Sequence, residues 1–268
     1  PQPAYVAYEP CAVLAGAKPV IIPLKAENEF RLTAQELLDA ITEKTKILIL
    51  PYPNNPTGAI MEREDLEAIA KIVEEKDLFV ISDEIYSELT YKGNPVSITQ
   101  MPGMRERTVL INGFSKAYAM TGWRLGYLAC TPALYQVVLK LFQHSISCTS
   151  GFLQRGALTA LDCVEETEQM RQAYEKRKNL LFEGIREIPG VELLTPAGAF
   201  YAWVKFDTDM DSETLCNDLL DKAKIAGVPG IAYGEEDCVC IRFSFAASED
   251  VLRTMLERLK TYQENHTK

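Results

Sequence analysis

Residues 113–126 (GFSKAYAMTGWRLG) carry two charges, Lys116 and Arg124, among aromatic, small and hydroxyl side chains. An ordinary solvated surface mixes acidic and basic residues, and this segment has no acidic residue. A lysine amine can form a Schiff base with a carbonyl compound, and the planar fork of an arginine suits phosphate oxygens. The segment therefore raises the question of whether these two cations serve a reaction.

Two other polar segments share one feature with this one. Residues 51–58 (PYPNNPTG) and residues 83–86 (DEIY) each follow a short apolar run, as residues 113–116 do. Taken singly, each has a plain structural explanation, because asparagine, proline and glycine favour turns and lone polar residues are commonly solvated. Their shared position after apolar runs favours a functional role for the set.

The elements that would position these segments follow from apolar patterning. Strands are expected at four apolar runs, residues 47–50, 78–81, 109–111 and 125–130. Residues 62–76 place apolar side chains three and four positions apart, which predicts an amphipathic helix, and Thr131 and Pro132 predict the N-cap and first residue of another. This alternation predicts an α/β fold, a mainly parallel sheet with flanking helices.

The second part of the chain has a different pattern. A long, charge-rich helix is expected over residues 164–187, followed by short strands and two further helices, the strands at residues 191–194, 200–204 and 239–245 and the helices at 212–224 and 248–261. We therefore predict two domains, a large one over residues 1–170 and a smaller α+β domain over residues 171–268.

The three polar segments lie just past the carboxyl ends of expected parallel strands. Those strand ends meet at one edge of an open α/β sheet, which is where such sheets bind ligands. The order of strands and polar segments therefore predicts a ligand site at this edge.

Composition limits the classes of partner. The chain has 268 residues, 47% hydrophobic and 25% charged, and its net charge of −10 disfavours a nucleic-acid backbone or an anionic membrane as partner. No apolar run is long enough to span a bilayer, and the first residues lack the pattern of a secretory signal. Small molecules are the expected partners, and a cytoplasmic location is expected.

Cysteine and histidine usage argues against a metal site. The seven cysteines show no C-x-x-C spacing and an odd count, as free thiols in a reducing compartment would. Only His144 and His266 are available as imidazole ligands. Cys238 and Cys240 alternate in an apolar run, which is typical of one face of a strand, so we predict no metal.

The motifs NNPTG, DEIYSEL, SKAYAMTGWRLGY and IRFSFA resemble, in this order, the signature segments of the class I/II aminotransferases, pyridoxal-phosphate enzymes of fold type I. The resemblance runs from about residue 1 to the C-terminus. It implies a large domain with a mainly parallel sheet, a small domain containing the C-terminus, and a homodimer. It also implies pyridoxal 5'-phosphate as cofactor, with amino acids and 2-oxo acids as substrates.

The resemblance gives Lys116 and Arg124 their expected roles. Lys116 matches the family lysine that forms a Schiff base with the cofactor and moves a proton during the reaction. Arg124 matches the arginine that binds the cofactor phosphate, with Ser115 as a hydroxyl donor. Many relatives carry a further serine where this chain has Gly113, so one phosphate hydrogen bond is expected to be absent.

The remaining cofactor contacts are also implied by the resemblance. Asp83 matches the carboxylate that keeps the pyridine nitrogen protonated. Tyr86 and Asn55 match the pair that hydrogen-bonds the ring oxygen. Tyr5 fits the aromatic residue that stacks on the ring, and a core tyrosine is the alternative reading.

Substrate recognition is assigned to one arginine. Arg242 lies in an apolar strand pattern, where it needs an acidic partner or a ligand carboxylate, and it matches the family arginine that binds the substrate α-carboxylate. Asn55 is expected to contribute to the same recognition. Asn54 and residues 198–201 are expected to be turn and wall elements.

Relatives have a long segment before the position of Pro1, including a phosphate-binding loop. We therefore expect the chain to be the C-terminal majority of an aminotransferase, with weak cofactor binding and no activity of its own. The expected reaction is amino transfer between aspartate, an aromatic amino acid or a similar donor and a 2-oxo acid. A pyridoxal-phosphate lyase or synthase of the same fold, and a cofactor-sensing effector domain of a transcription regulator, remain alternatives.

Overall fold

A computed structural model of the chain describes residues 1–266, which form two compact units. The terminal unit consists of Pro1–Arg31, Asn54–Ala59 and Gln172–Lys268, and the central unit consists of Leu32–Pro53 and Ile60–Arg171. Along the chain, the central unit ends at Arg171, close to the predicted domain boundary. Residues 1–31 and the NNPTG turn, however, belong to the same unit as the C-terminal part. The assignment of residues 1–170 to one large domain remains a prediction.

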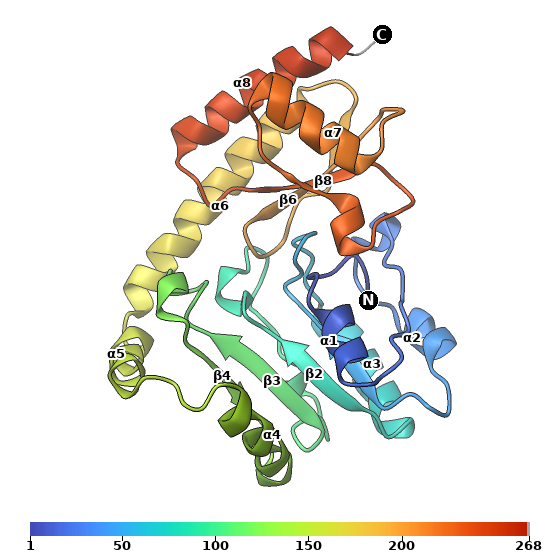
Figure 1. Cartoon of the computed structure of the whole chain (residues 1–268), viewed down its shortest axis with the longest axis vertical. Helices are drawn as coiled ribbons and strands as arrows, with labels where there is room; N and C mark the ends of the chain where they lie inside the picture. The colour runs from blue at the N-terminus through green and yellow to red at the C-terminus, as the bar shows by residue number, and fades with distance from the viewer. Residues whose placement is uncertain (267–268) are drawn as a thin grey trace. The chain divides into compact units, whose positions relative to one another are not determined.

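The central unit contains a four-stranded sheet in the order β1-β2-β3-β4 (Figure 1). Strands β1, β2 and β3 are parallel, with Leu50 opposite Ser82 and Asp83 opposite Ile111, whereas β4 is antiparallel to β3. The predicted mainly parallel sheet is confirmed, with strand bounds of Ile47–Leu50 (β1), Phe79–Asp83 (β2), Thr108–Gly113 (β3) and Gly126–Ala129 (β4).

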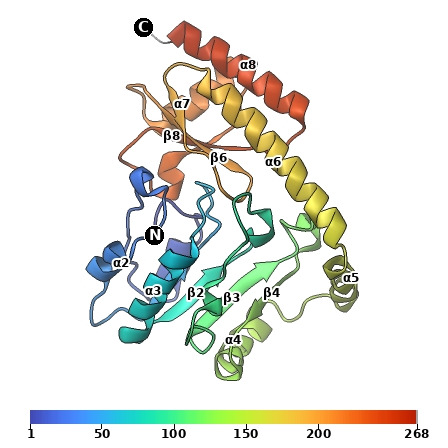
Figure 2. The ribbon, with the colours of Figure 1, turned by 180° about the vertical axis from the view of Figure 1, so that it is seen from behind.

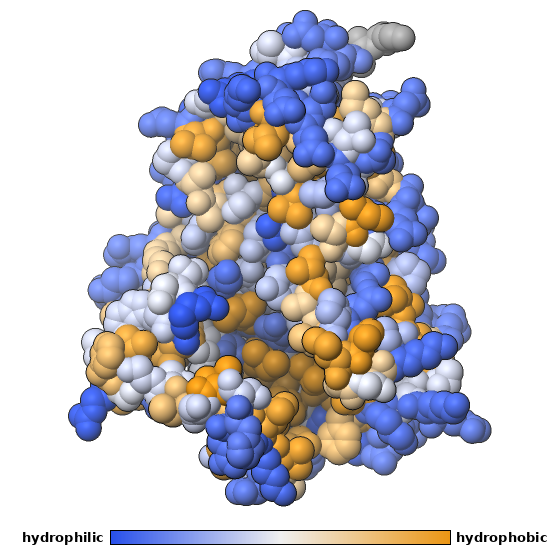
Figure 3. All heavy atoms as spheres, viewed as in Figure 1, coloured by the Kyte–Doolittle hydropathy of each residue, from blue (hydrophilic) through white to orange (hydrophobic). Residues whose placement is uncertain are grey.

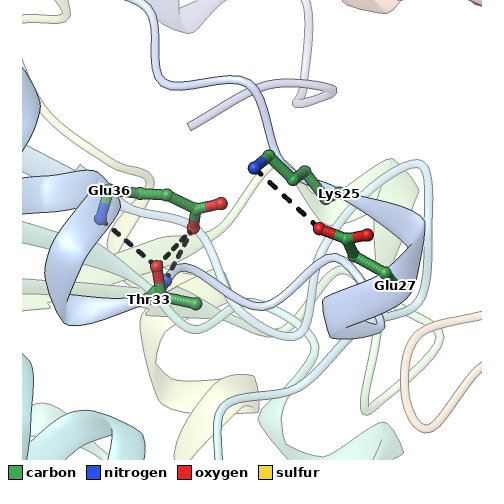
Figure 4. A network of polar contacts seen from close by, with 4 residues as sticks. All are labelled: Lys25, Glu27, Thr33 and Glu36. Atoms are coloured by element: carbon green, nitrogen blue, oxygen red, sulfur yellow. Dashed lines mark hydrogen bonds and ion pairs between the residues drawn. The ribbon is translucent and has the colours of Figure 1, made fainter.

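Helix α3 (Arg63–Glu75) of the central unit buries one apolar stripe, and Figure 2 shows it against one face of the sheet. Helix α2 (Ala34–Ala40) begins at a capping box in which Thr33 and Glu36 satisfy each other's backbone N–H groups (Figure 4). The remaining helices here are α4 (Pro132–Ser145), α5 (Gly151–Leu161) and short 3₁₀ turns at Ser87–Leu89, Ile98–Gln100 and Thr121–Trp123.

The terminal unit contains an antiparallel sheet in the order β5-β6-β8-β7. Its strands are β5 (Val191–Leu193), β6 (Tyr201–Phe206), β7 (Val228–Pro229) and β8 (Cys240–Ser244). Its helical segments are α1 (Tyr8–Leu14), α7 (Ser212–Asp218), α8 (Glu249–His266), a wider π turn at Leu219–Ala223, and 3₁₀ turns at Ala26–Asn28 and Gly230–Tyr233.

Helix α6 (Val164–Arg186) is one continuous helix that contains the sequence boundary between the units. In the terminal unit it crosses α8 at Gly184, where an added Cβ would collide with the side chain of Leu256. Figures 1 and 2 both show the two helices side by side. The glycine therefore permits a close helix crossing, and Leu181 and Ile185 beside it are buried.

The central unit also has an exposed apolar surface. Every residue of the edge strand β4 is exposed, and helices α4 and α5 present large apolar side chains to the outside, among them Val137, Leu141, Phe152 and Leu158. Figure 3 shows apolar atoms at the surface over both helices. Large apolar side chains exposed on neighbouring elements are typical of interaction surfaces. In the part of the chain that the structure describes, no helix is long and apolar enough to cross a membrane.

Candidate active site

Asp83 stands at the carboxyl end of strand β2, at the sheet edge where the sequence predicts a ligand site. Its register partner is Ile111 of β3, so the ends of the two parallel strands lie next to each other. The carboxylate Oδ1 accepts a hydrogen bond from the backbone N–H of Ile85 at 3.2 Å, and the side chain is half-buried. This contact orients the carboxylate at the start of the loop that carries Tyr86.

Lys116 and Tyr86 lie close together beside these strand ends. Lys116 is half-buried in the turn after β3, and its Nζ lies 5.8 Å from the centroid of the Tyr86 ring. Tyr86 itself is 6% exposed. The structure therefore brings an amine, a phenol and a strand-end carboxylate, all predicted from the sequence, into one part of the central unit.

The loop between β3 and β4 carries Lys116 and Arg124 together. A hydrogen bond from the Phe114 N–H to the Leu125 carbonyl closes the loop at 3.2 Å. Arg124 has a left-handed backbone (φ 52°), is exposed, and donates from Nη1 to the Thr121 carbonyl at 2.9 Å. The guanidinium is thus tethered to its own turn while the rest of its donors face solvent. Ser115 is half-buried beside Lys116.

Gly113 stands at the end of β3, directly opposite Gly126 of β4. A Cβ at Gly113 would lie 2.9 Å from the Gly126 Cα and 3.1 Å from the Leu125 carbonyl oxygen. Both neighbours are backbone atoms, so they cannot move aside as a flexible side chain would. The structure thus gives a steric reason for glycine at position 113.

Glu84 is a buried carboxyl group beside Asp83 that the sequence prediction did not single out. It is 9% exposed, and its Oε1 accepts hydrogen bonds from Ser82 Oγ at 2.8 Å and Ser97 Oγ at 2.7 Å. Burial raises the pKa of Glu84, against the effect of the two serine hydroxyls. Its position next to Asp83 in the DEIY motif could have indicated Glu84 from the sequence.

A small pocket adjoins Glu84 and is lined by residues such as Tyr52, Ser82 and Thr90. None of the predicted site residues, all of which the structure describes, lines it. The pocket is therefore a feature distinct from the strand-end residues Asp83 and Lys116.

Arg242 is held in the terminal unit by an amide and two aromatic rings. Its Nη1 donates to Asn55 Oδ1 at 2.9 Å, and its guanidinium carbon lies 4.2 Å from the Tyr201 ring centroid and 5.2 Å from that of Tyr233. Among the described residues no carboxylate pairs with Arg242, and its buried Nε has no hydrogen-bond partner. The arrangement leaves a half-buried cation without a counter-ion, which suits a carboxylate ligand.

The two tyrosines around Arg242 were not assigned this role from the sequence. Tyr201 belongs to the segment expected to form a wall, and its position on β6 next to β8 accounts for the contact. Tyr233 comes from the 3₁₀ turn after β7, and no local pattern indicated it. Burial raises the pKa of Tyr233 to about 12, so the ring beside Arg242 is a neutral phenol near pH 7.

The structure distinguishes Asn54, Asn55 and Tyr5. Asn54 is fully buried, and its Oδ1 accepts from the N–H of Thr57 at 3.1 Å and from Thr57 Oγ1 at 2.9 Å, as a turn-forming residue does. Asn55 faces Arg242 instead. Tyr5 is 47% exposed and packs edge-on against Tyr8, so the alternative of a core tyrosine is wrong. Its stacking role stays a prediction.

The predicted site residues thus fall into two groups. Asp83, Tyr86, Ser115, Lys116 and Arg124 belong to the central unit, whereas Tyr5, Asn55 and Arg242 belong to the terminal unit. Within residues 1–266 the structure contains no cluster of three or more side chains suited to hold a metal ion.

Comparison with known proteins gives one consistent result. The family model described as aminotransferase class I and II matches residues 1–259. The chain is 41% identical over 264 residues to a putative aminotransferase, YugH, of Bacillus subtilis, covering 98% of this chain and 68% of that protein. It is 41% identical over 263 residues to an aspartate aminotransferase of Musicola paradisiaca, covering 97% of this chain and 66% of that protein.

Solved structures agree with these relatives. An aromatic aminotransferase from Pyrococcus horikoshii matches with a TM-score of 0.96 and 39% sequence identity, covering 99% of this chain and 72% of that one. The chain spans about two thirds of the length of the curated relatives it matches. The predicted fold and the predicted enzyme class are confirmed at the level of the family. The chain belongs to the class I and II aminotransferases.

Proposed function

We propose that this chain carries the catalytic lysine and the carboxylate-binding arginine of a pyridoxal-phosphate-dependent aminotransferase. The observation that carries the proposal is the grouping of Asp83, Tyr86 and Lys116 at the ends of two adjacent parallel strands. Its relatives are named as aspartate and aromatic aminotransferases, which favours amino transfer over the lyase and effector alternatives.

The side chains of the central unit suit pyridoxal phosphate in their chemistry. Lys116 offers a half-buried amine for the aldehyde, Asp83 a carboxylate for the ring nitrogen, and Tyr86 a buried phenol for the ring oxygen. Arg124 offers guanidinium donors that face solvent, and Ser115 a hydroxyl, for the phosphate. Each polar group of the cofactor thus has a complementary side chain in this unit.

When bound, pyridoxal phosphate supplies a ring that withdraws electrons from the substrate α-carbon. The carboxylate of Asp83 would favour a protonated ring nitrogen by its opposite charge. The amine of Lys116 would hold the cofactor aldehyde and would carry a proton to and from the substrate α-carbon as general base and acid. The phenol of Tyr86 would donate a hydrogen bond to the ring oxygen and so orient the ring.

Arg242 binds the α-carboxylate of the amino-acid or 2-oxo-acid substrate in this proposal. Its uncompensated charge and its unpartnered Nε support the role, and the Tyr201 ring packs against the guanidinium, whose carbon lies 4.2 Å from the ring centroid. Asn55 orients Arg242 through its side-chain oxygen. Aspartate, an aromatic amino acid or a similar donor, with a 2-oxo acid as acceptor, is the proposed substrate pair.

Homodimer formation by the intact enzyme is part of the proposal, supported by the exposed apolar side chains of α4 and α5 beside β4. Sedimentation of the intact enzyme measures it, and a monomer of that enzyme at micromolar concentration would oppose it. A cytoplasmic location stays a prediction.

Borohydride trapping tests the lysine directly. The chain is incubated with pyridoxal phosphate, reduced, and digested with trypsin, and the adduct is expected on the peptide of residues 108–124, which contains Lys116 as its only lysine. Lys116→Ala should abolish the adduct, whereas Lys140→Ala, at an exposed position of α4, should retain it. An adduct spread over surface lysines, unaffected by Lys116→Ala, would refute the assignment.

The reaction type is tested by the products. In the intact enzyme, amino transfer predicts that an amino acid is converted to its 2-oxo acid while the cofactor retains the amino group. Release of ammonia with pyruvate would instead identify a lyase.

A further inference from the structure

The sulfur atoms of Cys238 and Cys240 lie 2.8 Å apart. A disulfide bond is about 2.05 Å long, so the two atoms need to approach by less than 1 Å to become bonded. Both cysteines are reduced in the structure. The sequence pattern suggested only that they share one face of a strand, and nothing in the proposed aminotransferase reaction uses them.

The backbone around the two cysteines is fixed by the sheet. Cys240 is the first residue of β8 and pairs with Lys205 of β6. The carbonyl of Val239, between the cysteines, accepts a hydrogen bond from the Phe206 N–H at 2.8 Å. On its other side Cys240 is packed against Gly230, where an added Cβ would meet its carbonyl oxygen at 2.9 Å. The short sulfur separation is therefore built into the ordered part of the strand.

The two thiols differ in exposure and in acidity. Cys238 lies in the bend before β8 and is half-exposed, whereas Cys240 is 2% exposed. A hydrogen bond from Cys240 lowers the pKa of Cys238, and the same contact together with burial raises the pKa of Cys240. This asymmetry is the one expected of an attacking thiol next to a resolving thiol.

A metal ion is a poor alternative for this pair. Structural zinc sites need four ligands, and within the described residues no group of three metal-binding side chains occurs. Glu235 acts on the pKa of Cys238, but the two cysteines and Glu235 supply at most three of the four ligands and are not arranged to hold a metal ion.

We propose that Cys238 and Cys240 form a reversible intramolecular disulfide by exchange with a low-molecular-weight disulfide. The Cys238 thiolate attacks one sulfur of the oxidant, forming a mixed disulfide and releasing one small thiol. The Cys240 thiol then loses its proton and attacks the Cys238 sulfur, which releases the second small thiol. Two electrons pass from the protein dithiol to the oxidant, and two protons leave with the two released thiols.

The position of the pair gives the modification a structural consequence. Cys240 and Arg242 are two residues apart on β8, so their side chains lie on the same face of the sheet. Gly230, which contacts Cys240, begins the 3₁₀ turn that carries Tyr233, one of the rings around Arg242. A disulfide here adds a covalent restraint directly beside the arginine.

Peptide mapping after treatment with oxidised glutathione tests the proposal. Trypsin releases residues 225–242 as one peptide, whose only cysteines are Cys238 and Cys240. After oxidation and blocking of remaining thiols, this peptide should be lighter than its reduced form by two hydrogen atoms, without a blocking group or glutathione. Dithiothreitol should restore both thiols.

Single variants separate the two roles. Cys240→Ser should leave glutathione attached at Cys238, because the resolving thiol is gone, and Cys238→Ser should leave Cys240 reduced, because it is buried. Cys11→Ser, at an exposed cysteine elsewhere, should not change the result for residues 225–242. The proposal is overturned if the unmodified chain keeps both thiols free, or carries glutathione on this peptide, at oxidant concentrations that modify Cys11.

Discussion

Replacement of Arg242 is the sharpest test of substrate recognition by this chain. Arg242→Ala removes a guanidinium that has no carboxylate partner among the described residues and lies 4.2 Å from the Tyr201 ring. Hydrogen bonds to charged groups contribute about 1.5–3 kcal/mol each. Loss of two such bonds from one fork therefore costs about 3 kcal/mol at the lower limit, which is roughly a 150-fold loss of affinity.

Arg242→Lys separates charge from geometry. A lysine keeps one positive charge but loses the planar fork and the stacking on Tyr201, and cation–π contacts of this kind contribute about 0.5–1 kcal/mol. Together with one lost hydrogen bond, this predicts an affinity about 30-fold below that of the unmodified chain. The lysine variant should thus fall between the alanine variant and the unmodified chain.

Calorimetric titration with a small dicarboxylate such as succinate measures the effect. Lys205→Ala is the matched control, because it removes one positive charge from the neighbouring strand, where Lys205 is exposed and pairs with Glu192 at 3.5 Å. Thermal unfolding of each variant checks the fold, since Arg242→Ala also leaves Asn55 Oδ1 without its donor, at a cost of about 1 kcal/mol. An alanine variant that binds within threefold of the unmodified chain would show that Arg242 does not bind carboxylates.

Three further perturbations test the central unit. Asp83→Asn should leave cofactor attachment at Lys116 intact but lower turnover at least tenfold, measured by single-turnover kinetics in the whole enzyme, because the ring nitrogen loses its charged partner. Burial raises the pKa of Glu84, so the folded state binds this proton more tightly than the unfolded state, and the free energy of unfolding should fall as pH rises above about 4.3. The free energy of unfolding of Glu84→Gln, measured with urea, should lack this component of the pH dependence. The same pH dependence in the variant and in the unmodified chain would contradict a raised pKa of Glu84. Gly113→Ser should lower the free energy of unfolding by about 1–3 kcal/mol through collision with backbone, whereas Gly122→Ser, in open space, should change it little.

Elements with strong local signals were predicted accurately from the sequence. Thr131 and Pro132 do begin α4, with the Thr131 hydroxyl accepting from the Leu134 N–H. The apolar spacing of residues 62–76 gave α3 within one residue at each end. In both cases the determining interactions lie within one turn or one face of the element, so a short window of sequence contains them.

Elements with boundaries set by distant contacts were predicted less well. The helix expected over residues 212–224 ends as α7 at Asp218 and continues as a wider turn, and α8 extends five residues beyond the expected Thr261. One contact joins the end of α7 to the extension of α8, because the Tyr262 hydroxyl donates a hydrogen bond to the Asp218 carboxylate. Helix α2 was missed although its capping box, Thr33 with Glu36, is a readable local signal.

The same distinction applies to the candidate site. Asp83, Lys116 and Arg242 carry charge in apolar or strand-end positions, so their residue types indicated a role. The residue types of the neighbours that orient them did not indicate a role in the sequence. Tyr233 reaches Arg242 only because β7 and β8 pair, and Ser97 reaches Glu84 from a turn thirteen positions further along the chain. Such partners are defined by the fold and not by local pattern.

Gly113 shows how packing between two strands can determine a residue type beside the candidate site. Gly113 and Gly126 face each other across β3 and β4, where the strands lead directly into the loop that carries Lys116 and Arg124. A serine at position 113 would add a hydroxyl for a phosphate, but its Cβ would push against the backbone of the opposite strand. That displacement would act on the Phe114 N–H to Leu125 carbonyl hydrogen bond, which closes the loop. In this chain the close pairing of Gly113 with Gly126, next to the loop that carries the lysine and the arginine, therefore leaves no room for a side chain at position 113.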